Sequence, residues 1–347
     1  MLENQIWRNL VIWVGNETKW SNTRGTPVDP QVKIPFTEYS ILPNLENFED
    51  NSGFWTNVEV NSVQSVRSYY TWTFAGYVRP SFVYLMPSVL SSYNYTTETK
   101  TIDGSDVDFD VYTFWIEDNN TNKSITFSEK LDDDNIKQQK YLGMVDEMTI
   151  THNQNEAIWF SWTFIAKWGE WKSFDWTSVS SITQDYPYYG RYTTVELTGD
   201  GQLSYINDLQ LTLTKNASIE DTNFGLWEYQ PTDINNKQIR PELSFSRKFL
   251  QDNSTSDDSK FKEKYENWEI VEFVFNTPIY KKEVNWNEIG YMKTTVKWQI
   301  SNWENNFNLD WFPTEDITVL VVSSESNPLE TEMWFDQTEF GFGDILE

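Results

Sequence analysis

Three aspartates in the run Asp106–Trp115, DVDFDVYTFW, are the residues whose type and spacing most directly suggest chemistry. Side chains alternate between the two faces of a β-strand, so a strand here puts Asp106, Asp108 and Asp110 on one face and apolar residues on the other. Carboxylates two residues apart on a strand lie about 7 Å from each other and repel. The pattern indicates either a solvated edge of a β-domain or an acidic wall.

Catalytic and metal chemistry have little support elsewhere in the chain. It has no cysteine, which excludes disulfides, thiolate metal sites and cysteine nucleophiles. His152 is the only histidine and follows a strand-like run, where a structural role is expected. The triplet Asp132–Asp134 lacks the glycine of a calcium loop and is interpreted as a solvated charge run.

Enzyme motifs are also missing from the sequence. No glycine-rich phosphate loop, nucleophile elbow or metal-ligand spacing occurs. With 53 acidic residues, spacing alone nominates no pair of carboxylates for glycoside hydrolysis. We therefore expect no enzymatic activity, no cofactor and no metal site.

The formal net charge is −27, from 53 acidic and 26 basic residues. A protein this acidic repels nucleic acid phosphates, which disfavours DNA binding by counterion release. Enclosing DNA without holding it is compatible with the same charge.

Composition favours a β-rich protein without membrane spans. Aromatic residues make up 17% of the 347 residues, and aromatic side chains suit half-buried pleated surfaces. No stretch approaches eighteen consecutive apolar residues. The first residues, MLENQIWRNLVIWVG, lack the pattern of a signal peptide.

The elements that must position these residues can be predicted from periodicity. Tyr141–Trp168 is the clearest hairpin, because apolar residues alternate on both sides of a turn at Asn153–Glu156. Asp257–Asn267 is the best helix, and Ser81–Leu90 is a candidate short helix. Four prolines in Thr26–Asn44 favour an extended loop or arm over a central strand. Further strands are expected at Val58–Val78, Leu203–Thr214, Glu242–Phe249, Glu269–Phe275 and Asp316–Ser323, a second hairpin at Tyr280–Trp303, and a loop at Ser91–Thr101.

The two halves of the chain share an order of elements: a strand, a helix-like segment, an acidic strand and a hairpin. We therefore predict a first β-subdomain over residues 1–185, with an extended amino-terminal arm, and a second over 186–325. In this comparison Glu269–Phe275 is the counterpart of Asp106–Trp115, and Thr294–Trp303 that of Ile158–Trp168.

Residues 326–347 are predicted to form an acidic, aromatic carboxy-terminal arm. No lysine or arginine follows Lys297, and exposed aromatic side chains are costly, so such an arm should dock on something. A neighbouring subunit is one candidate for that role.

Several of these stretches, in this order, resemble tail tube (major tail) proteins of long-tailed, non-contractile bacteriophages. The stretches that show this resemblance are RGTPVDPQVKIPFTEYSILPNLENFED within Arg24–Trp55, TFAGYVRP at Thr73–Pro80, the hairpin Tyr141–Trp168, and Tyr205–Thr214. The chain departs from the family in its aromatic content and in long loops at Gly169–Gly201 and Asn216–Ile239. No separate immunoglobulin-like domain can be placed.

The resemblance implies a mostly-β, sandwich- or barrel-like tail-tube fold, with two similar subdomains that each carry one short helix. Copies of the chain would form stacked rings, with three chains per ring if the halves are duplicated and six otherwise. DNA would pass through the hollow tube without specific binding, and other tail proteins would meet the tube ends. The expected location is the virion, after assembly in the host cytoplasm, with no membrane contact.

Site predictions follow from the same resemblance and from the charge pattern. The candidate channel-lining residues are Asp106, Asp108, Asp110, Glu269 and Glu272. The candidate subunit or ring contacts are Pro27, Pro30, Ile34, Phe36, Trp334, Phe335, Phe340 and Phe342.

Two alternatives stay open at this point. One is a carbohydrate-binding or adhesin-like β-domain that uses Trp159, Trp171 or Trp176 as stacking platforms. The other is a different tail protein, such as a terminator or connector.

Overall fold

The structure is a computed structural model, and the description that follows applies to part of the chain. It covers residues 11–17, 25–50, 62–90, 92–102, 104–116, 123–130, 137–171, 186–203, 206–220, 223–224, 228–235, 239–248, 257–280, 288–306, 314–321 and 327–345.

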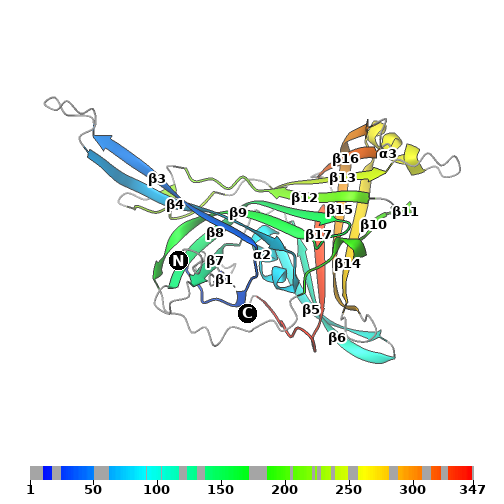
Figure 1. Ribbon diagram of the computed structural model, residues 1–347, viewed down its shortest axis with the longest axis horizontal. Helices are drawn as coiled ribbons and strands as arrows, with labels where there is room; N and C mark the ends of the chain where they lie inside the picture. The colour runs from blue at the N-terminus through cyan, green and yellow to red at the C-terminus, as the bar shows by residue number, and fades with distance from the viewer. Residues whose placement is uncertain are drawn as a thin grey trace, which may run out of the picture.

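The protein is mostly β, as the sequence predicted. Every strand among the described residues belongs to one antiparallel, branched sheet of 17 strands, and the helices described there are few and short (Figure 1). No helix among the described residues is long and apolar enough to cross a membrane. The elements are β1 (Val11–Asn16), β2 (Val32–Lys33), β3 (Glu38–Asp50), β4 (Ser62–Tyr77), η1 (Pro80–Tyr84), α2 (Met86–Val89), β5 (Ser92–Ile102), β6 (Ser105–Trp115), β7 (Ile125–Lys130), β8 (Lys137–Asn153), β9 (Trp159–Trp171), η3 (Gly190–Tyr192), β10 (Thr194–Leu197), β11 (Gly201–Gln202), β12 (Ile206–Thr214), β13 (Arg240–Lys248), α3 (Asp257–Glu266), β14 (Ile270–Tyr280), β15 (Glu288–Asn306), β16 (Thr314–Val321) and β17 (Leu329–Asp336).

The backbone of the architecture is a run of hydrogen-bonded strands that we call the central sheet. Its order is β3-β4-β9-β8-β12-β13-β16-β15-β14. Two branches leave it: β7 and β1 extend from the first half of β8, and β17, β6 and β5 extend from the first half of β15. The core lies between the central sheet and these branches.

The helices η1 and α3 cover the same face of the central sheet. Phe82 of η1 packs against Phe160 and Trp162 of β9, with ring centroids 5.4 and 5.3 Å apart. Phe261 of α3 packs against Phe245 of β13 at 6.0 Å. These aromatic contacts remove large apolar areas from water and are the main reason the helices sit where they do. The opposite face of the sheet is left without a helix among the described residues.

The period-two pattern of the strands explains this one-sided burial. In β12, Leu209, Leu211 and Leu213 are buried, while Gln210 and Thr212 between them are exposed or half-buried. The hairpin β8–β9, the strands β12, β13, β14 and β16, and the helix α3 therefore lie where the sequence predicted them.

Two local predictions need comment. Ser91–Thr101 was expected to be a loop, which is wrong: Ser92–Ile102 forms β5, because its threonines and tyrosines suit a strand despite their polarity. The proline-rich stretch does supply an edge, since β3 contains Pro43 and pairs only with β4 among the described strands.

The pairing scheme of the central sheet occurs twice. β4 ends at Tyr77, opposite Trp159 at the start of β9, and β13 ends at Lys248, opposite Thr314 at the start of β16. Matching these ends superposes β3-β4-β9-β8 on β12-β13-β16-β15, and in each half a helical segment follows the second strand in sequence.

This repeat corrects the sequence comparison of the halves. The counterpart of β9 is β16, not Thr294–Trp303, which belongs to β15. Likewise β14 pairs along β15, whereas β6 pairs with β17 and β5, so Glu269–Phe275 does not correspond to Asp106–Trp115. Sequence order alone could not reveal which strands are neighbours. The two predicted subdomains also share this sheet, because β8 pairs with β12 across the expected boundary.

A buried lysine lies beside the covered face of the sheet. The Lys215 ammonium donates a hydrogen bond to the Ser88 carbonyl of α2 at 2.8 Å, and burial lowers the pKa of Lys215 to about 7. Burial disfavours the charged form of the amine.

The lowered pKa makes a specific prediction for stability. Between about pH 7 and the ordinary lysine value of 10.5, the unfolded chain holds the Lys215 proton more tightly than the folded chain. Folding is therefore expected to become more favourable as pH rises from 7 towards 9. Urea unfolding should show a smaller slope with pH for Lys215→Met, while the exposed control Lys262→Met keeps the wild-type slope. An unchanged slope in Lys215→Met would contradict this account.

Candidate functional site

The uncovered face of the central sheet forms a broad polar surface, which we call the open face. Its side chains are exposed or half-buried and alternate with the buried apolar residues of the same strands. Neighbouring strands place these groups in rows, because directly opposite residues share a face. The described members include Thr73, Glu147, Thr149, Ser161, Thr163, Asp208, Gln210, Thr212, Glu242, Ser244, Asp316 and Thr318.

The chemistry of the open face is that of hydroxyls and carboxylates. One row runs Ser161, Thr149, Thr212 and Glu242 across four strands, and the Thr149 and Thr212 hydroxyl oxygens lie 3.5 Å apart. Bases also lie on this face, each beside a carboxylate: Arg240 is 3.9 Å from Glu242, and Lys297 is 3.6 Å from Glu272. The surface is therefore well hydrated, and its bases are partly neutralised by neighbouring acids.

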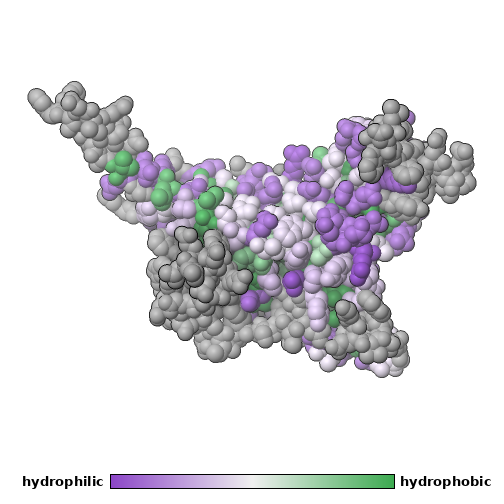
Figure 2. Space-filling view, in the orientation of Figure 1, coloured by the Kyte–Doolittle hydropathy of each residue, from purple (hydrophilic) through white to green (hydrophobic). Residues whose placement is uncertain are grey.

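The hairpin β3–β4 projects beyond the rest of the molecule and forms what we call the arm (Figure 1). Four aliphatic side chains of the arm are in water: Leu42 is 60% exposed, Leu45 54%, Val63 60% and Val66 41%. Figure 2 shows hydrophobic surface along this projection. Burying a leucine or valine fully contributes about 1.5–3 kcal/mol, so the arm is suited to packing against a partner.

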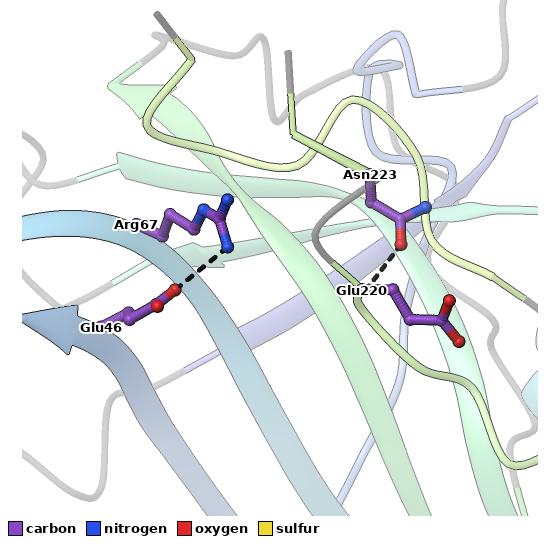
Figure 3. A network of polar contacts seen from close by, with 4 residues as sticks. All are labelled: Glu46, Arg67, Glu220 and Asn223. Carbon is purple, nitrogen blue, oxygen red and sulfur yellow. Dashed lines mark hydrogen bonds and ion pairs between the residues drawn. The ribbon is translucent and has the colours of Figure 1, made fainter. Parts of the chain in front are cut away.

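The base of the arm is braced by the loop that follows β12. Arg67 of β4 forms an ion pair with Glu46 of β3 at 3.3 Å (Figure 3). The Arg67 guanidinium also lies 4.6 Å from the centroid of the Phe224 ring. The Ser68 amide donates to the Tyr229 carbonyl at 2.9 Å. Within the loop, Asn223 accepts a hydrogen bond from the Glu220 amide at 2.7 Å, as Figure 3 also shows. The arm therefore has a defined direction.

Several strand edges in the central sheet are open among the described residues, and two of them are long enough to matter here. The outer edge of β3 has no partner strand. On the side of β15 that faces β14, pairing stops at Gln299, which leaves residues 300–306 without a strand there. Unpaired edges are templates for pairing with another chain.

Of the predicted channel-lining residues, Asp106 and Asp108 are exposed at the outer end of β6. They accept hydrogen bonds from the hydroxyls of Thr101 and Thr99, at 2.8 and 2.6 Å. This end of β6 belongs to a branch and not to the central sheet.

Asp110 is different, and the expectation that it faces water is wrong. It is 1% exposed and accepts hydrogen bonds from the Tyr95 hydroxyl at 2.9 Å, the Gln337 amide at 2.7 Å and the Gly343 backbone at 3.3 Å. The carboxy-terminal segment covers this end of the aspartate face and uses Asp110 as its anchor. Burial, with the charge of Asp110, raises the pKa of Tyr84 to about 12.

Glu269 and Glu272 lie elsewhere. Glu269 is exposed and 3.6 Å from the Lys264 ammonium, while Glu272 is half-buried on the open face and 3.6 Å from Lys297. Asp110 is opposite Phe335 of β17, and Phe335 is opposite Gly290 of β15. Glu272 is opposite Lys297 of β15, which is seven residues, or about 23 Å along the strand, from Gly290. The structure does not bring the two acidic groups together.

The predicted contact residues are largely occupied within the chain. Pro30, Ile34, Trp334 and Phe335 are buried, which corrects the expectation that they are free for a subunit contact. Pro27, Phe36, Phe340 and Phe342 are half-buried. The cause is that the segment before the arm runs beside β1, and that residues 329–336 form β17 between β6 and β15.

His152 has a structural setting. Its Nδ1 lies 3.3 Å from the Thr193 hydroxyl, and burial lowers the pKa of His152 to about 4. Within the described ranges, no three histidine, aspartate or glutamate side chains are grouped to hold a metal ion.

The arm leucines and valines were missed by sequence reasoning. The signal available for the leucines was the run SILPNLENF, where aliphatic residues stand beside a proline and an acid without the alternation of a core strand. Their exposure depends on how far the arm reaches past the body.

Comparison with known proteins identified no relative of this chain. No protein-family model matches the sequence, and none of the curated proteins matches it significantly.

Proposed function

We propose that this chain is a structural subunit that assembles with copies of itself into rings, which stack into a hollow tube. The function proposed is that of a phage tail tube in the virion, with the open face towards a channel for DNA. One observation carries the proposal: a wide sheet whose η1 and α3 helices lie on one face, which is polar over most of the other face, and which is bounded by open edges and an exposed apolar arm.

The internal repeat supports a particular way of closing the ring. Within the chain, β12 pairs with residues 147–153 of β8, just past the place where β7 stops pairing at Gly143. In the second half, β14 stops at Gln299 and residues 300–306 of β15 are open. The strand equivalent to β12 is β3, whose outer edge is open as well. In the proposal, β3 of one copy pairs with residues 300–306 of the next.

The register of this contact follows from the same superposition. Matching the strand ends makes Leu42 equivalent to Thr212, and Glu304 equivalent to Thr149. Thr212 and Thr149 are directly opposite each other within the chain, so Leu42 should oppose Glu304 of the next copy. Pro43 has no N–H, so one backbone hydrogen bond is missing either from the ladder with β4 or from the ladder with the next copy.

Three copies joined in this way contain six equivalent sets of four strands, which gives a three-chain ring with approximate sixfold symmetry. The hydroxyl and carboxylate groups of the open face would line its interior. A net charge of −27 would keep DNA mobile there by repulsion. In the proposal, the arms pack against neighbouring copies and other tail proteins meet the tube ends. Assembly takes place in the host cytoplasm.

An engineered disulfide tests both the assembly and the register. The native chain has no cysteine, so Leu42→Cys/Glu304→Cys introduces the only pair of thiols. Opposite residues on antiparallel strands have Cβ atoms about 4.5–5.5 Å apart, close to the separation a disulfide needs. After oxidation, a gel without reductant should show a ladder that ends at the trimer, and negative-stain electron microscopy should show rings or tubes.

The controls test ring assembly and the proposed edge contact separately. Each single variant should give dimers at most, and Leu42→Cys/Glu98→Cys, with its second thiol on exposed β5, should give no ladder. Wild-type protein that stays monomeric at millimolar concentration would reject the assembly. Rings that form without a ladder in the matched pair would reject the proposed edge contact.

A further inference from the structure

A cavity of about 680 Å³ lies at the turn end of the β8–β9 hairpin, at the rim of the open face. This volume is in the range of small-molecule sites. Its lining comes from three strand ends, the β8–β9 turn and the segment before η3, and includes Tyr77, Arg79, Asn153, Glu156, Trp159 and Tyr189.

Aromatic rings form one part of the lining. Tyr77 and Trp159 are cross-strand partners on β4 and β9, with ring centroids 5.3 Å apart and planes at 83°. Tyr77 and Tyr189 each keep 40% of their surface exposed. Rings left open to a cavity offer flat apolar faces, while their polar ends stay in water.

Planar polar groups form the other part. The Asn153 amide donates to the Glu156 carboxylate at 3.0 Å, and Arg79 adds a guanidinium at the start of η1. Amide, carboxylate and guanidinium groups together supply donors and acceptors that can bind adjacent hydroxyls.

The walls of the cavity are held by backbone contacts. Tyr188 bonds to both flanking strands, its amide donating to Val78 at 2.9 Å and its carbonyl accepting from Ile158 at 2.8 Å. At Gly190 an added Cβ would lie 2.1 Å from the Asn153 carbonyl oxygen, so only glycine allows this segment to approach the turn. The site is therefore formed before any ligand arrives.

Charge narrows the ligand class. The lining has one base, Arg79, and one acid, Glu156, so it offers no net charge to bind an ionic ligand. The chain's net charge of −27 further repels anions. A neutral ligand with an apolar face and several hydroxyls satisfies the rings and the planar polar groups together. We infer that this cavity binds a neutral saccharide, stacked against Trp159 or Tyr77 and hydrogen-bonded by Asn153, Glu156 and Arg79.

Binding can be measured on the purified full-length chain by isothermal titration and saturation-transfer NMR. The probes are the trimer of N-acetylglucosamine, its cationic deacetylated form, the trimer of glucose, and the anionic trimer of galacturonate. At least one neutral trimer should bind with a submillimolar Kd, and the charged trimers at least tenfold more weakly.

Variants then locate the site. Trp159→Ala should raise the Kd at least tenfold, and Glu156→Gln, at an exposed position that does not disturb folding, about threefold to tenfold. Trp268→Ala removes a tryptophan that is 67% exposed elsewhere and should leave the Kd unchanged. Absence of binding by both neutral trimers, tighter binding of a charged one, or an equal loss in Trp268→Ala would overturn the inference. None of these results depends on ring assembly.

Discussion

Replacing Glu315 by alanine is expected to destabilise the fold by about 3–5 kcal/mol, because it leaves a buried guanidinium without its carboxylate. Glu315 is 0% exposed and forms an ion pair with Arg247, its cross-strand partner, whose side chain is 5% exposed. Glu315 also accepts a hydrogen bond from the Trp303 indole at 2.9 Å, and Arg247 lies 4.5 Å from the Phe261 ring centroid. The pair thus joins β13, β16, β15 and α3.

Urea unfolding monitored by tryptophan fluorescence measures this loss. The double variant Arg247→Met/Glu315→Leu should recover most of it, since neither charge is then buried alone, although it still lacks the Trp303 bond, worth about 1 kcal/mol, and the contact of the guanidinium with Phe261. Glu242→Ala is the matched control: its contact with Arg240 at 3.9 Å is between exposed side chains and should change stability by less than about 1 kcal/mol. A loss below about 1 kcal/mol in Glu315→Ala would contradict this account.

The same variant bears on assembly. Trp303 lies in residues 300–306 of β15, the edge proposed to receive β3 of the next copy. Loss of its indole bond should loosen that edge, so rings of Glu315→Ala are expected to dissociate at lower urea than the wild-type subunit unfolds. Unfolding and dissociation at the same urea concentration would argue against an effect on the edge.

Replacing Glu17 by glutamine is the second large effect expected. The Glu17 carboxylate is fully buried and accepts from the backbone of Gly25 at 2.7 Å and of Leu142 at 3.0 Å, and from the hydroxyls of Thr126 at 2.7 Å and of Ser124. Glutamine keeps the shape but turns one acceptor into a donor that faces donors. Each buried donor left unsatisfied costs about 1–3 kcal/mol, so a loss of about 3 kcal/mol is expected.

Thermal unfolding followed by circular dichroism measures the Glu17→Gln effect. The exposed change Glu98→Gln is the isosteric control and should shift Tm little. Glu17 also holds the amide of Leu142, whose φ of 54° is in the left-handed region that costs free energy for a leucine. A Glu17→Gln variant as stable as Glu98→Gln would show that these donors find other partners.

Local pattern was enough to predict much of the fold. The alternation of Ile158–Trp168 and of Leu209–Leu213 gives each strand one apolar face, and burial of that face is what a sheet requires. Asp257–Asn267 predicts α3 because its acids, apolar pair and lysines follow helical spacing. The prolines of Thr26–Asn44 argued against a central strand because proline cannot donate to a ladder, and β3, which contains Pro43, lies at an edge. These features depend on residues a few positions apart.

Only the tertiary structure decided what each acidic residue does. Asp106 and Asp110 lie on one face of one strand, yet Asp106 is in water and Asp110 is an internal acceptor, because residues 337–343 cover one end of that face. Glu17 and Glu315 look like surface acids in sequence and serve as buried anchors. Spacing along a strand sets which face a side chain occupies. What lies on that face is set by segments far away in the chain. Distant segments also determine that β8 and β15 each pair with different strands along their two halves.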